Sequence, residues 1–278
     1  MILDRLINKP GIGPLILKRR NQAAVRLALS DVRSKSNALF AVKHALTQAH
    51  QRVATTAELQ LWKHIERRRR ELSNRTDTIQ DIDYGAGYAG SQFTEAQQRK
   101  GVVSATSVKE LTSFSKVAFW AEVLYHLTKA LRPHNVLEMG TCVGISGSYI
   151  AAALQLSEQG RLWTIEGSPA TAALAQNTFQ LLGLSDWVTC LVGPFHEVLV
   201  LCLKEQGPFD LIFVDGHHDG KATMGYFRQL VPHLCPHAII VFDDIDWSEG
   251  MGQSWKEIST DPSVKDYVRI GGMGAVAF

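Results

Sequence analysis

Short apolar runs alternate with helical patterns along the second half of the chain. The runs are typical of buried strands and fall at residues 136–137, 161–165, 187–192, 209–214 and 238–242. Amphipathic patterns typical of helices fill the intervals and begin near residues 145, 169, 195 and 221. Because strands that alternate with helices build a parallel sheet covered on both faces, this pattern predicts an α/β fold.

The pattern changes in the last part of the chain. A helix is predicted over about residues 248–259, and two strand-like segments follow at residues 264–270 and 273–278. Gly271 and Gly272 join these two segments, as in a β-hairpin. We therefore expect a hairpin to close one edge of the sheet, and we expect the domain to end with it.

The first half is predicted to be mainly helical. Residues 21–72 contain no glycine or proline, which predicts one long helix or two shorter ones with an apolar face. The run Y-G-A-G-Y-A-G from Tyr84 to Gly90 lies in a segment, 73–107, that we expect to be a flexible loop, either a linker or a lid. A further helix is expected over residues 106–131. We divide the chain into a helical extension at residues 1–105 and a domain at residues 106–278.

The charge of the chain is distributed unevenly. Lys and Arg exceed Asp and Glu by 11 in residues 1–134, whereas acidic residues are in excess by 9 in residues 135–278. This asymmetry is compatible with contact to nucleic acid or a membrane surface, and also with packing of the two halves or association of subunits. We favour the last two interpretations, and the long amphipathic extension predicts a homodimer formed through the N-terminal helices.

The cysteines and the N-terminus indicate where in the cell the protein is located. The four cysteines are scattered without the spacing of a metal or redox motif, which indicates a reduced, cytoplasmic protein. Gly13 and Pro14 interrupt the apolar stretch near the N-terminus. Neither a signal peptide nor a membrane span is expected.

The run N-V-L-E-M-G-T-C-V-G-I-S, from Asn135 to Ser146, predicts a strand, a glycine-rich turn and the start of a helix. Gly140 and Gly144 allow close approach of a ligand, and the first amides of the helix are free to bind a polar or anionic group. An ordinary strand-to-helix connection is the alternative. Glu166 ends the next strand about 20 residues later, where nucleotide-binding units place a ribose-binding carboxylate, so we predict an adenosine-containing cofactor.

Acidic residues follow several predicted strands. Because ligands bind beyond the carboxyl ends of parallel strands, we expect these carboxylates to converge on one site. They are Glu138, Glu166, Asp215, Asp243 and Asp244. The last three could cap helices or hold loops, but three neighbouring carboxylates would repel each other unless a proton or a cation neutralised them. Oxygen ligands of this kind suit Mg²⁺ or another divalent cation.

These motifs resemble the class I S-adenosylmethionine-dependent methyltransferases. The run E-M-G-T-C-V-G-I-S is similar to the first motif of their O-methyltransferase branch, and the resemblance covers roughly residues 101–278. It implies a Rossmann-like seven-stranded sheet whose last strand runs antiparallel. It also implies that S-adenosylmethionine is bound by Glu138, Gly140, Thr141, Gly144, Ser146, Glu166 and Gly193.

The resemblance also suggests the catalytic chemistry. Catechol- and caffeoyl-type O-methyltransferases hold a divalent ion with an aspartate after the fourth strand and an Asp-Asn pair after the fifth, which implies Asp215, Asp243 and Asp244 here. Asp replaces Asn in this chain. Those enzymes place a basic lysine three positions after the first aspartate, where this chain has His218. The cephalosporin- and macrolide-sugar-type enzymes carry histidine there, so we predict that His218 is the base, beside Asp215.

These features together predict an O-methyltransferase that acts on a hydroxyl of a small phenolic or natural-product acceptor, with or without a divalent ion. Trp247 and the tyrosines at 84 and 88 are candidate walls of the acceptor pocket. The N-terminal extension would serve assembly or act as a lid. Two alternatives remain open: a nucleic-acid methyltransferase that uses the basic front half, and an inactive cofactor-binding interaction protein.

Overall fold

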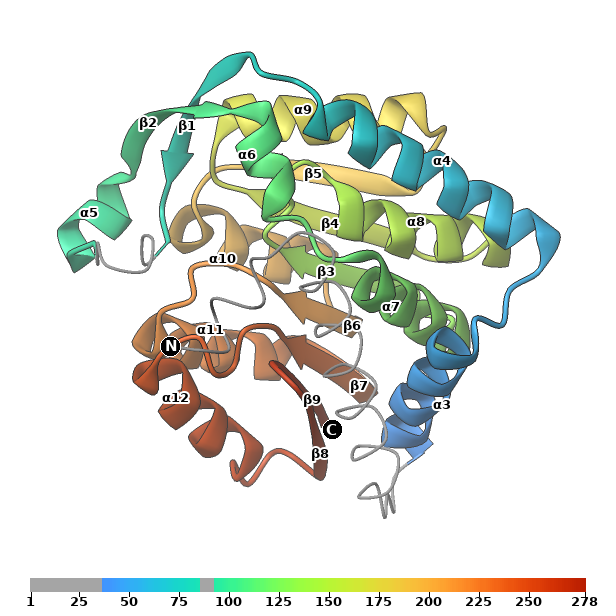
Figure 1. Ribbon diagram of the computed structural model, residues 1–278. Helices are drawn as coiled ribbons and strands as arrows, with labels where there is room; N and C mark the ends of the chain where they lie inside the picture. Colours follow the sequence, from blue (N-terminus) through green and yellow to red (C-terminus); the bar gives the residue numbers. More distant parts are fainter. Residues whose placement is uncertain (1–36, 86–92) are drawn as a thin grey trace, which may run out of the picture.

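The computed structural model describes residues 37–85 and 93–278 of the chain. A seven-stranded sheet forms its centre (Figure 1), with the strand order β5-β4-β3-β6-β7-β9-β8. In that order the strands are Val188–Val192, Arg161–Glu166, Asn135–Met139, Phe209–Val214, Leu234–Phe242, Met273–Ala277 and Asp266–Ile270. Strands β3 to β7 are parallel, and β9 is antiparallel to both of its neighbours. The predicted α/β fold and terminal hairpin are confirmed.

Helices cover both faces of the sheet, because successive side chains of each strand point to opposite faces. Leu211 and Phe213 of β6 belong to one apolar core, whereas Ile212 and Val214 belong to the other. The first face carries α7 (Ala118–Leu131), α8 (Ile145–Ser157) and α9 (Pro169–Leu181); the second carries α10 (Phe195–Gln206), α11 (Gly220–Leu230) and α12 (Glu249–Ser259). A short 3₁₀ turn, η1 (Val231–His233), connects α11 to β7.

Two further helices, α3 (Asn37–Gln51) and α4 (Thr56–Ser73), extend the first face. Sequence analysis expected one or two helices here, and its residues 21–36 lie outside the described residues. The apolar faces of both helices are buried in the core of the first face, since Leu46 and Leu72 are each 0% exposed. Arg68 is also buried and donates a hydrogen bond to Asn177 Oδ1 of α9 at 2.8 Å. Many apolar side chains of these two helices therefore pack against the rest of the chain.

Residues 73–107 differ from the expected flexible loop. They contain two antiparallel strands, β1 (Thr78–Asp83) and β2 (Val102–Ser107), and a short helix, α5 (Glu95–Lys100). Both strands are rich in β-branched residues, which favour a pleated conformation. Strand β2 crosses residue 105, where we placed the end of the extension, and that division stays a prediction. Residues 86–92, including Tyr88, lie outside the described residues.

The helix expected over residues 106–131 is interrupted. Residues 106–107 belong to β2, and the helical part is split into α6 (Val108–Ser113) and α7. The stretch from Phe114 to Val117 between them is not helical, and the sequence T-S-F-S-K there is rich in serine and threonine, which compete with helix formation. This interruption matters because it carries Lys116 into the site described below.

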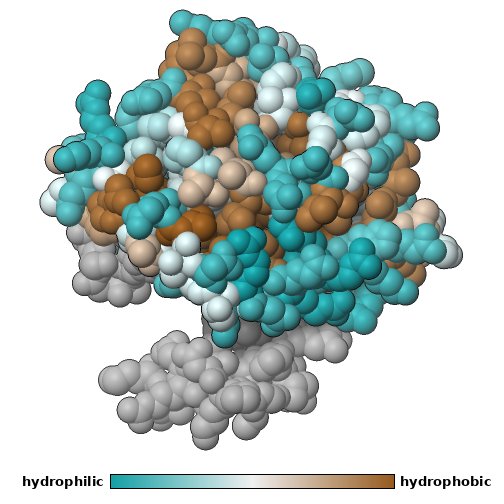
Figure 2. All heavy atoms as spheres, turned by 90° about the horizontal axis from the view of Figure 1, so that it is seen from above, coloured by the Kyte–Doolittle hydropathy of each residue, from teal (hydrophilic) through white to brown (hydrophobic). Residues whose placement is uncertain are grey.

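The surface over α4 and α9 mixes hydrophilic and hydrophobic side chains (Figure 2). Leu59 and Leu181 are among its exposed apolar residues.

Within residues 37–85 and 93–278, no helix combines the length and the apolar character that crossing a bilayer requires.

Candidate functional site

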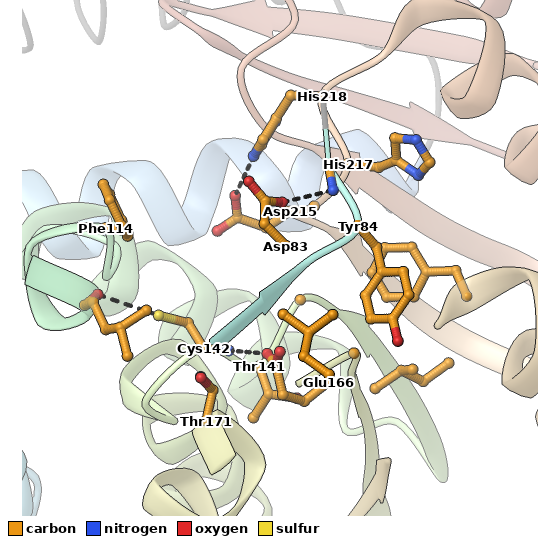
Figure 3. Close-up of a pocket in the computed structure, with 18 of the residues that line it drawn as sticks. Asp83, Tyr84, Phe114, Thr141, Cys142, Glu166, Thr171, Asp215, His217 and His218 are labelled. Atoms are coloured by element: carbon orange, nitrogen blue, oxygen red, sulfur yellow. Dashed lines mark hydrogen bonds and ion pairs between the residues drawn. The ribbon is translucent and has the colours of Figure 1, made fainter. Parts of the chain in front are cut away.

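A cavity of about 460 Å³ opens at the carboxyl ends of β3, β4 and β6. Its walls come from the turn after β3, the end of β4, the loops after β6 and β7, strand β1 and the break between α6 and α7 (Figure 3). The predicted site residues in this lining are Gly140, Thr141, Ser146, Glu166, Asp215, His218 and Asp244. The others lie behind it, and they are Glu138, Gly144, Gly193 and Asp243.

The turn after β3 brings main-chain groups to the cavity. Gly140 has a φ of +107°, and a Cβ atom there would lie 2.0 Å from the main-chain oxygen of Asp215. Gly144, with a φ of +85°, is the N-cap of α8. The hydrogen-bond ladder of α8 begins with the Ser148 amide donating to the Gly144 carbonyl, so the amides before Ser148 precede it. Earlier in the turn, the amides of Gly140 and Thr141 donate to the Ile165 carbonyl, and the amide of Gly144 donates to the Thr141 carbonyl. The first amides of α8 are therefore the candidates for binding a polar group, and this role stays a prediction.

Glu166 ends β4 and lines the same part of the cavity. Its carboxylate accepts hydrogen bonds from the amides of Cys142 at 2.8 Å and Ser168 at 3.0 Å. Burial raises the pKa of Glu166 to about 7, an effect that Asp81 increases and these two amides oppose. Glu166 thus lies next to the glycine turn, where a ribose-binding carboxylate belongs.

Glu138 and Gly193 support this region from outside the cavity. Glu138 is 0% exposed and accepts a hydrogen bond from Thr164 Oγ1 at 2.7 Å; Thr141 Oγ1 lies 2.6 Å from the same hydroxyl. Burial raises the pKa of Glu138 to about 7. The Gly193 amide donates to the Glu166 carbonyl at 2.8 Å. The geometry gives both residues a positioning role behind the predicted cofactor site.

At the other end of the cavity, His218 lies between two carboxylates. Its Nε2 atom is 4.0 Å from Asp215 Oδ1, and its Nδ1 atom is 3.9 Å from Asp244 Oδ2. The His218 ring also packs against Trp247, with 6.1 Å between the ring centroids. One ligand atom from each of Asp215, His218 and Asp244 can be chosen so that all three lie within 4.8 Å of one another. This group could hold a divalent ion, or the carboxylates could orient the imidazole.

Asp243 has a different partner. Its carboxylate forms an ion pair with Lys116, whose Nζ atom also lies 3.5 Å from Asp215 Oδ2. The three aspartates predicted as metal ligands are therefore not equally available, because a lysine ammonium occupies one of them. The sequence pattern does not reveal the role of Lys116, because residue 116 lies in a stretch predicted to be one continuous helix. The serine- and threonine-rich stretch at residues 112–115 was the available signal.

His217, the neighbour of the predicted base, is already fully engaged. Its Nε2 atom is 2.8 Å from Gln98 Oε1, and its Nδ1 atom is 2.7 Å from the hydroxyl of Tyr226. An amide oxygen only accepts, so Nε2 carries the proton and Nδ1 accepts from the tyrosine. Burial lowers the pKa of His217, which favours this neutral form. His217 has no free nitrogen for an acceptor, so His218 is the candidate base of this adjacent pair.

Backbone strain is concentrated around the cavity. In the described part of the chain, eight residues other than glycine have a positive φ, and four of them line the cavity: Cys142, His217, His218 and Asp244. A Cβ atom makes this conformation unfavourable by roughly 1 kcal/mol or more per residue. Such strain persists only where surrounding contacts impose it, and it clusters at functional sites. The loops after β6 and β7 thus hold their side chains in imposed positions.

Strand β1 forms a wall that sequence analysis did not predict. Asp81 accepts a hydrogen bond from Thr171 Oγ1 at 2.7 Å, and burial raises the pKa of Asp83. The ring of Tyr84 packs so closely on Gly167 that a Cβ atom there would lie 2.6 Å from it. Tyr84, a candidate wall of the acceptor pocket, lines the cavity beside the end of β4, and its contact with an acceptor stays a prediction. The β-branched residues of β1 and β2 were the available signal.

Comparison with known proteins identifies related domains. Residues 137–245 match a family model described as a methyltransferase domain. The catechol O-methyltransferase of Niastella koreensis is 33% identical over 53% of this chain and 64% of its own length. The catechol O-methyltransferase of Mycobacterium tuberculosis is 31% identical over 51% of this chain and 62% of its own length. The matched region thus spans less than two thirds of either relative.

Solved structures share the fold. An O-methyltransferase from Bacillus cereus, crystallised with SAH, aligns with a TM-score of 0.53 at 24% identity, over 60% of this chain and 84% of its own. A putative O-methyltransferase from Klebsiella pneumoniae aligns with a TM-score of 0.51 at 19% identity, over 81% of this chain and 90% of its own. The family model, the curated relatives and the shared fold confirm the resemblance to class I O-methyltransferases.

Proposed function

We propose that this chain, whose residues 137–245 match a methyltransferase domain, transfers a methyl group from S-adenosylmethionine to a hydroxyl of a small molecule. One observation carries the proposal: a glycine turn and a ribose-type carboxylate share a single cavity with an imidazole held between two carboxylates. This arrangement provides for both the methyl donor and the activation of an acceptor hydroxyl.

The cofactor would bind at the end of the cavity formed by the turn after β3. The first amides of α8, at Ile145 and Ser146, would hold its methionine part, since the amides of Gly140, Thr141 and Gly144 donate to carbonyls within the chain. Glu166 would accept hydrogen bonds from the ribose hydroxyls. Gly193, expected on the adenine side, lies outside the cavity lining and would act through Glu166, whose carbonyl accepts a hydrogen bond from the Gly193 amide. Two comparisons support this assignment: the relatives are named O-methyltransferases, and the Bacillus cereus structure holds SAH.

His218 would act as the base. An imidazole can accept a hydroxyl proton near neutral pH, and Asp215 and Asp244 flank the two nitrogens so that the resulting positive charge is stabilised. The acceptor O–H bond breaks, its proton moves to His218, and the oxygen bonds to the methyl carbon as the carbon–sulfur bond breaks. The bound cofactor supplies the methyl group on a sulfonium. The protein contributes alignment of the two reactants and exclusion of water.

The divalent ion implied by the resemblance does not fit the predicted ligands well, since Lys116 is paired with Asp243. An ion could be held by Asp215, His218 and Asp244 instead. A nitrogen of His218 that ligates a metal cannot also accept a proton, so these two roles compete. We propose the role of base, and no step of the mechanism requires the ion.

The acceptor would enter beside Trp247, whose ring is 52% exposed and packs on His218. A phenolic or natural-product hydroxyl is the proposed acceptor class, in line with the catechol O-methyltransferases among the relatives. A homodimer and a cytoplasmic location stay predictions. Many apolar side chains of α3 and α4 are buried within the chain, whereas Phe40 of α3 and Leu59 of α4 are exposed.

Incubation with S-adenosylmethionine and a panel of hydroxyl compounds tests the proposal. Catechols, other phenols and sugars represent the panel, and mass spectrometry detects the methylated product and S-adenosylhomocysteine. We expect acceptor-dependent formation of both for at least one class. Methylation of RNA but of no small molecule would instead support the nucleic-acid alternative, and cofactor binding without any transfer would support the inactive binding protein.

A further inference from the structure

Lys116 carries a positive charge in a cavity whose other charged residues are mainly acidic. Among the described residues that line the cavity it is the one lysine or arginine, and five carboxylates share the lining with it: Asp81, Asp83, Glu166, Asp215 and Asp244. The Lys116 side chain is 12% exposed, and that of its partner Asp243 is 5% exposed. Breaking a buried ion pair leaves an uncompensated charge, which is strongly unfavourable. The pair therefore fixes the ammonium group of Lys116 inside the site.

The ammonium group occupies the place of a bridging cation. Asp215 follows β6, Asp243 follows the adjacent strand β7, and Lys116 reaches the carboxylates of both. These are two of the three aspartates for which the resemblance implied a divalent ion. An ammonium group and a divalent ion at the same carboxylate would repel each other strongly in a buried, low-dielectric setting. One of the two must be absent.

We propose that Lys116 is the resident cation of this site and that it excludes a divalent metal ion from Asp243. The exclusion follows from the ion pair and does not depend on the reaction. A second consequence rests on the proposed function: with Asp243 neutralised, the same ammonium group can hold the acceptor oxygen near Asp215 while His218 removes its proton. Lysine from the α6–α7 break would thus supply the positive charge that a metal supplies in the catechol- and caffeoyl-type enzymes.

Direct titration with Mn²⁺ tests the exclusion without using activity. The electron paramagnetic resonance signal of free Mn²⁺ reports binding to the full-length wild type and to Lys116→Met, which removes the charge and keeps the side-chain length. Lys109→Met is the matched control, because Lys109 is exposed on α6. A double variant, Lys116→Met with Asp243→Asn, asks whether Asp243 is the ligand. Thermal unfolding and binding of S-adenosylhomocysteine establish that each variant is folded.

We expect weak Mn²⁺ binding by the wild type and by Lys109→Met, at least ten-fold tighter binding by Lys116→Met, and loss of this gain in the double variant. A folded Lys116→Met that binds Mn²⁺ no more tightly than the wild type would overturn the proposal. If that variant does not fold, Lys116→Gln, which can still donate a hydrogen bond to Asp243, is tested by the same comparison of Mn²⁺ affinities. An inactive wild type would refute the proposed function but leave this titration unchanged.

Discussion

At one end of the cavity, the main chain of a single β3–α8–β4 unit borders the proposed cofactor position. At the other end, charged side chains from three segments that are far apart in the chain meet around the proposed acceptor position. Gly140 and the amide of Cys142 represent the first kind of construction, and Lys116, Asp215 and Asp244 represent the second. The first end depends mainly on the path of the backbone, with Glu166 as its carboxylate, whereas the second depends on several individual charges.

This difference predicts how each end fails. A change that alters the backbone should damage the cofactor end, even when no charge is lost. A change that keeps the backbone but removes one charged group should damage the acceptor end, and at the cofactor end it should matter at Glu166, the carboxylate proposed to bind the ribose. The following predictions test this division, beginning with the largest expected effect.

Replacing His218 with alanine should affect chemistry without affecting cofactor binding. We expect kcat to fall roughly 100- to 10,000-fold, the usual contribution of a general base, while the Kd for S-adenosylmethionine changes only a few-fold. Steady-state kinetics and calorimetry provide the two values. His217→Gln is the matched control, because His217 is occupied by Tyr226 and Gln98, and it should lower kcat far less. Unchanged turnover in His218→Ala would exclude this residue as the base.

Replacing Gly140 with alanine should break the cofactor end through the backbone alone. The new Cβ atom would meet the Asp215 carbonyl at 2.0 Å, so the turn has to move, and we expect a loss of about 3 kcal/mol or more in the free energy of unfolding. Gly183→Ala is the control. Gly183 also has a positive φ, +67°, but nothing lies within 4 Å of its Cβ position, so only about 1 kcal/mol should be lost. Similar losses in urea unfolding of both variants would contradict the close-approach argument.

Replacing Glu166 with glutamine should weaken S-adenosylmethionine binding by roughly 10- to 100-fold, because a charged acceptor of ribose hydrogen bonds is lost. The pKa of Glu166 is raised to about 7 by burial, so the carboxylate forms as the pH rises through that value. Wild-type affinity should therefore increase from pH 6 to pH 8, and the variant should lack this increase. Calorimetric titrations at the two pH values test the prediction; the same pH dependence in both proteins would argue against a ribose contact.

Glu138→Gln should have the smallest effect and a definite pH dependence. Burial raises the pKa of Glu138 to about 7 in the folded chain, above the ordinary value of 4.5. Its contribution to stability is therefore complete below pH 4.5 and is lost as the pH rises to about 7. Relative to the wild type, the variant should be less stable at pH 5 than at pH 8. Urea unfolding at both pH values measures the difference, and a constant difference would rule out this titration.

The cofactor end could be predicted from the sequence because it is local. The run from Glu138 to Ser146 and Glu166 lie in one βαβ unit, so spacing along the chain translates directly into position in space. The core elements were predictable for a similar reason: strand 209–214 has the expected bounds, since a buried apolar run flanked by glycine, proline and aspartate allows little else.

The acceptor end could be predicted only in part. Strand topology brings Asp215 and Asp244 to one edge, which the sequence analysis expected. Strand topology does not predict that Lys116 pairs with Asp243, because Lys116 lies in a break within a segment that has an otherwise helical pattern. Strand β1 was also not predicted. The contact of its Asp81 with Thr171, and that of the following Tyr84 with Gly167, depend on tertiary packing that a sequence pattern does not show.

The central claim is that this cavity binds S-adenosylmethionine at the turn after β3 without help from a metal. Calorimetric titration of the full-length chain with S-adenosylmethionine, in the presence of EDTA, tests it most directly. We expect saturable binding of one molecule per chain, with an affinity that Glu166→Gln weakens and His218→Ala leaves nearly unchanged. Absence of binding, or binding that Glu166→Gln does not alter, would contradict the assignment of the cofactor end.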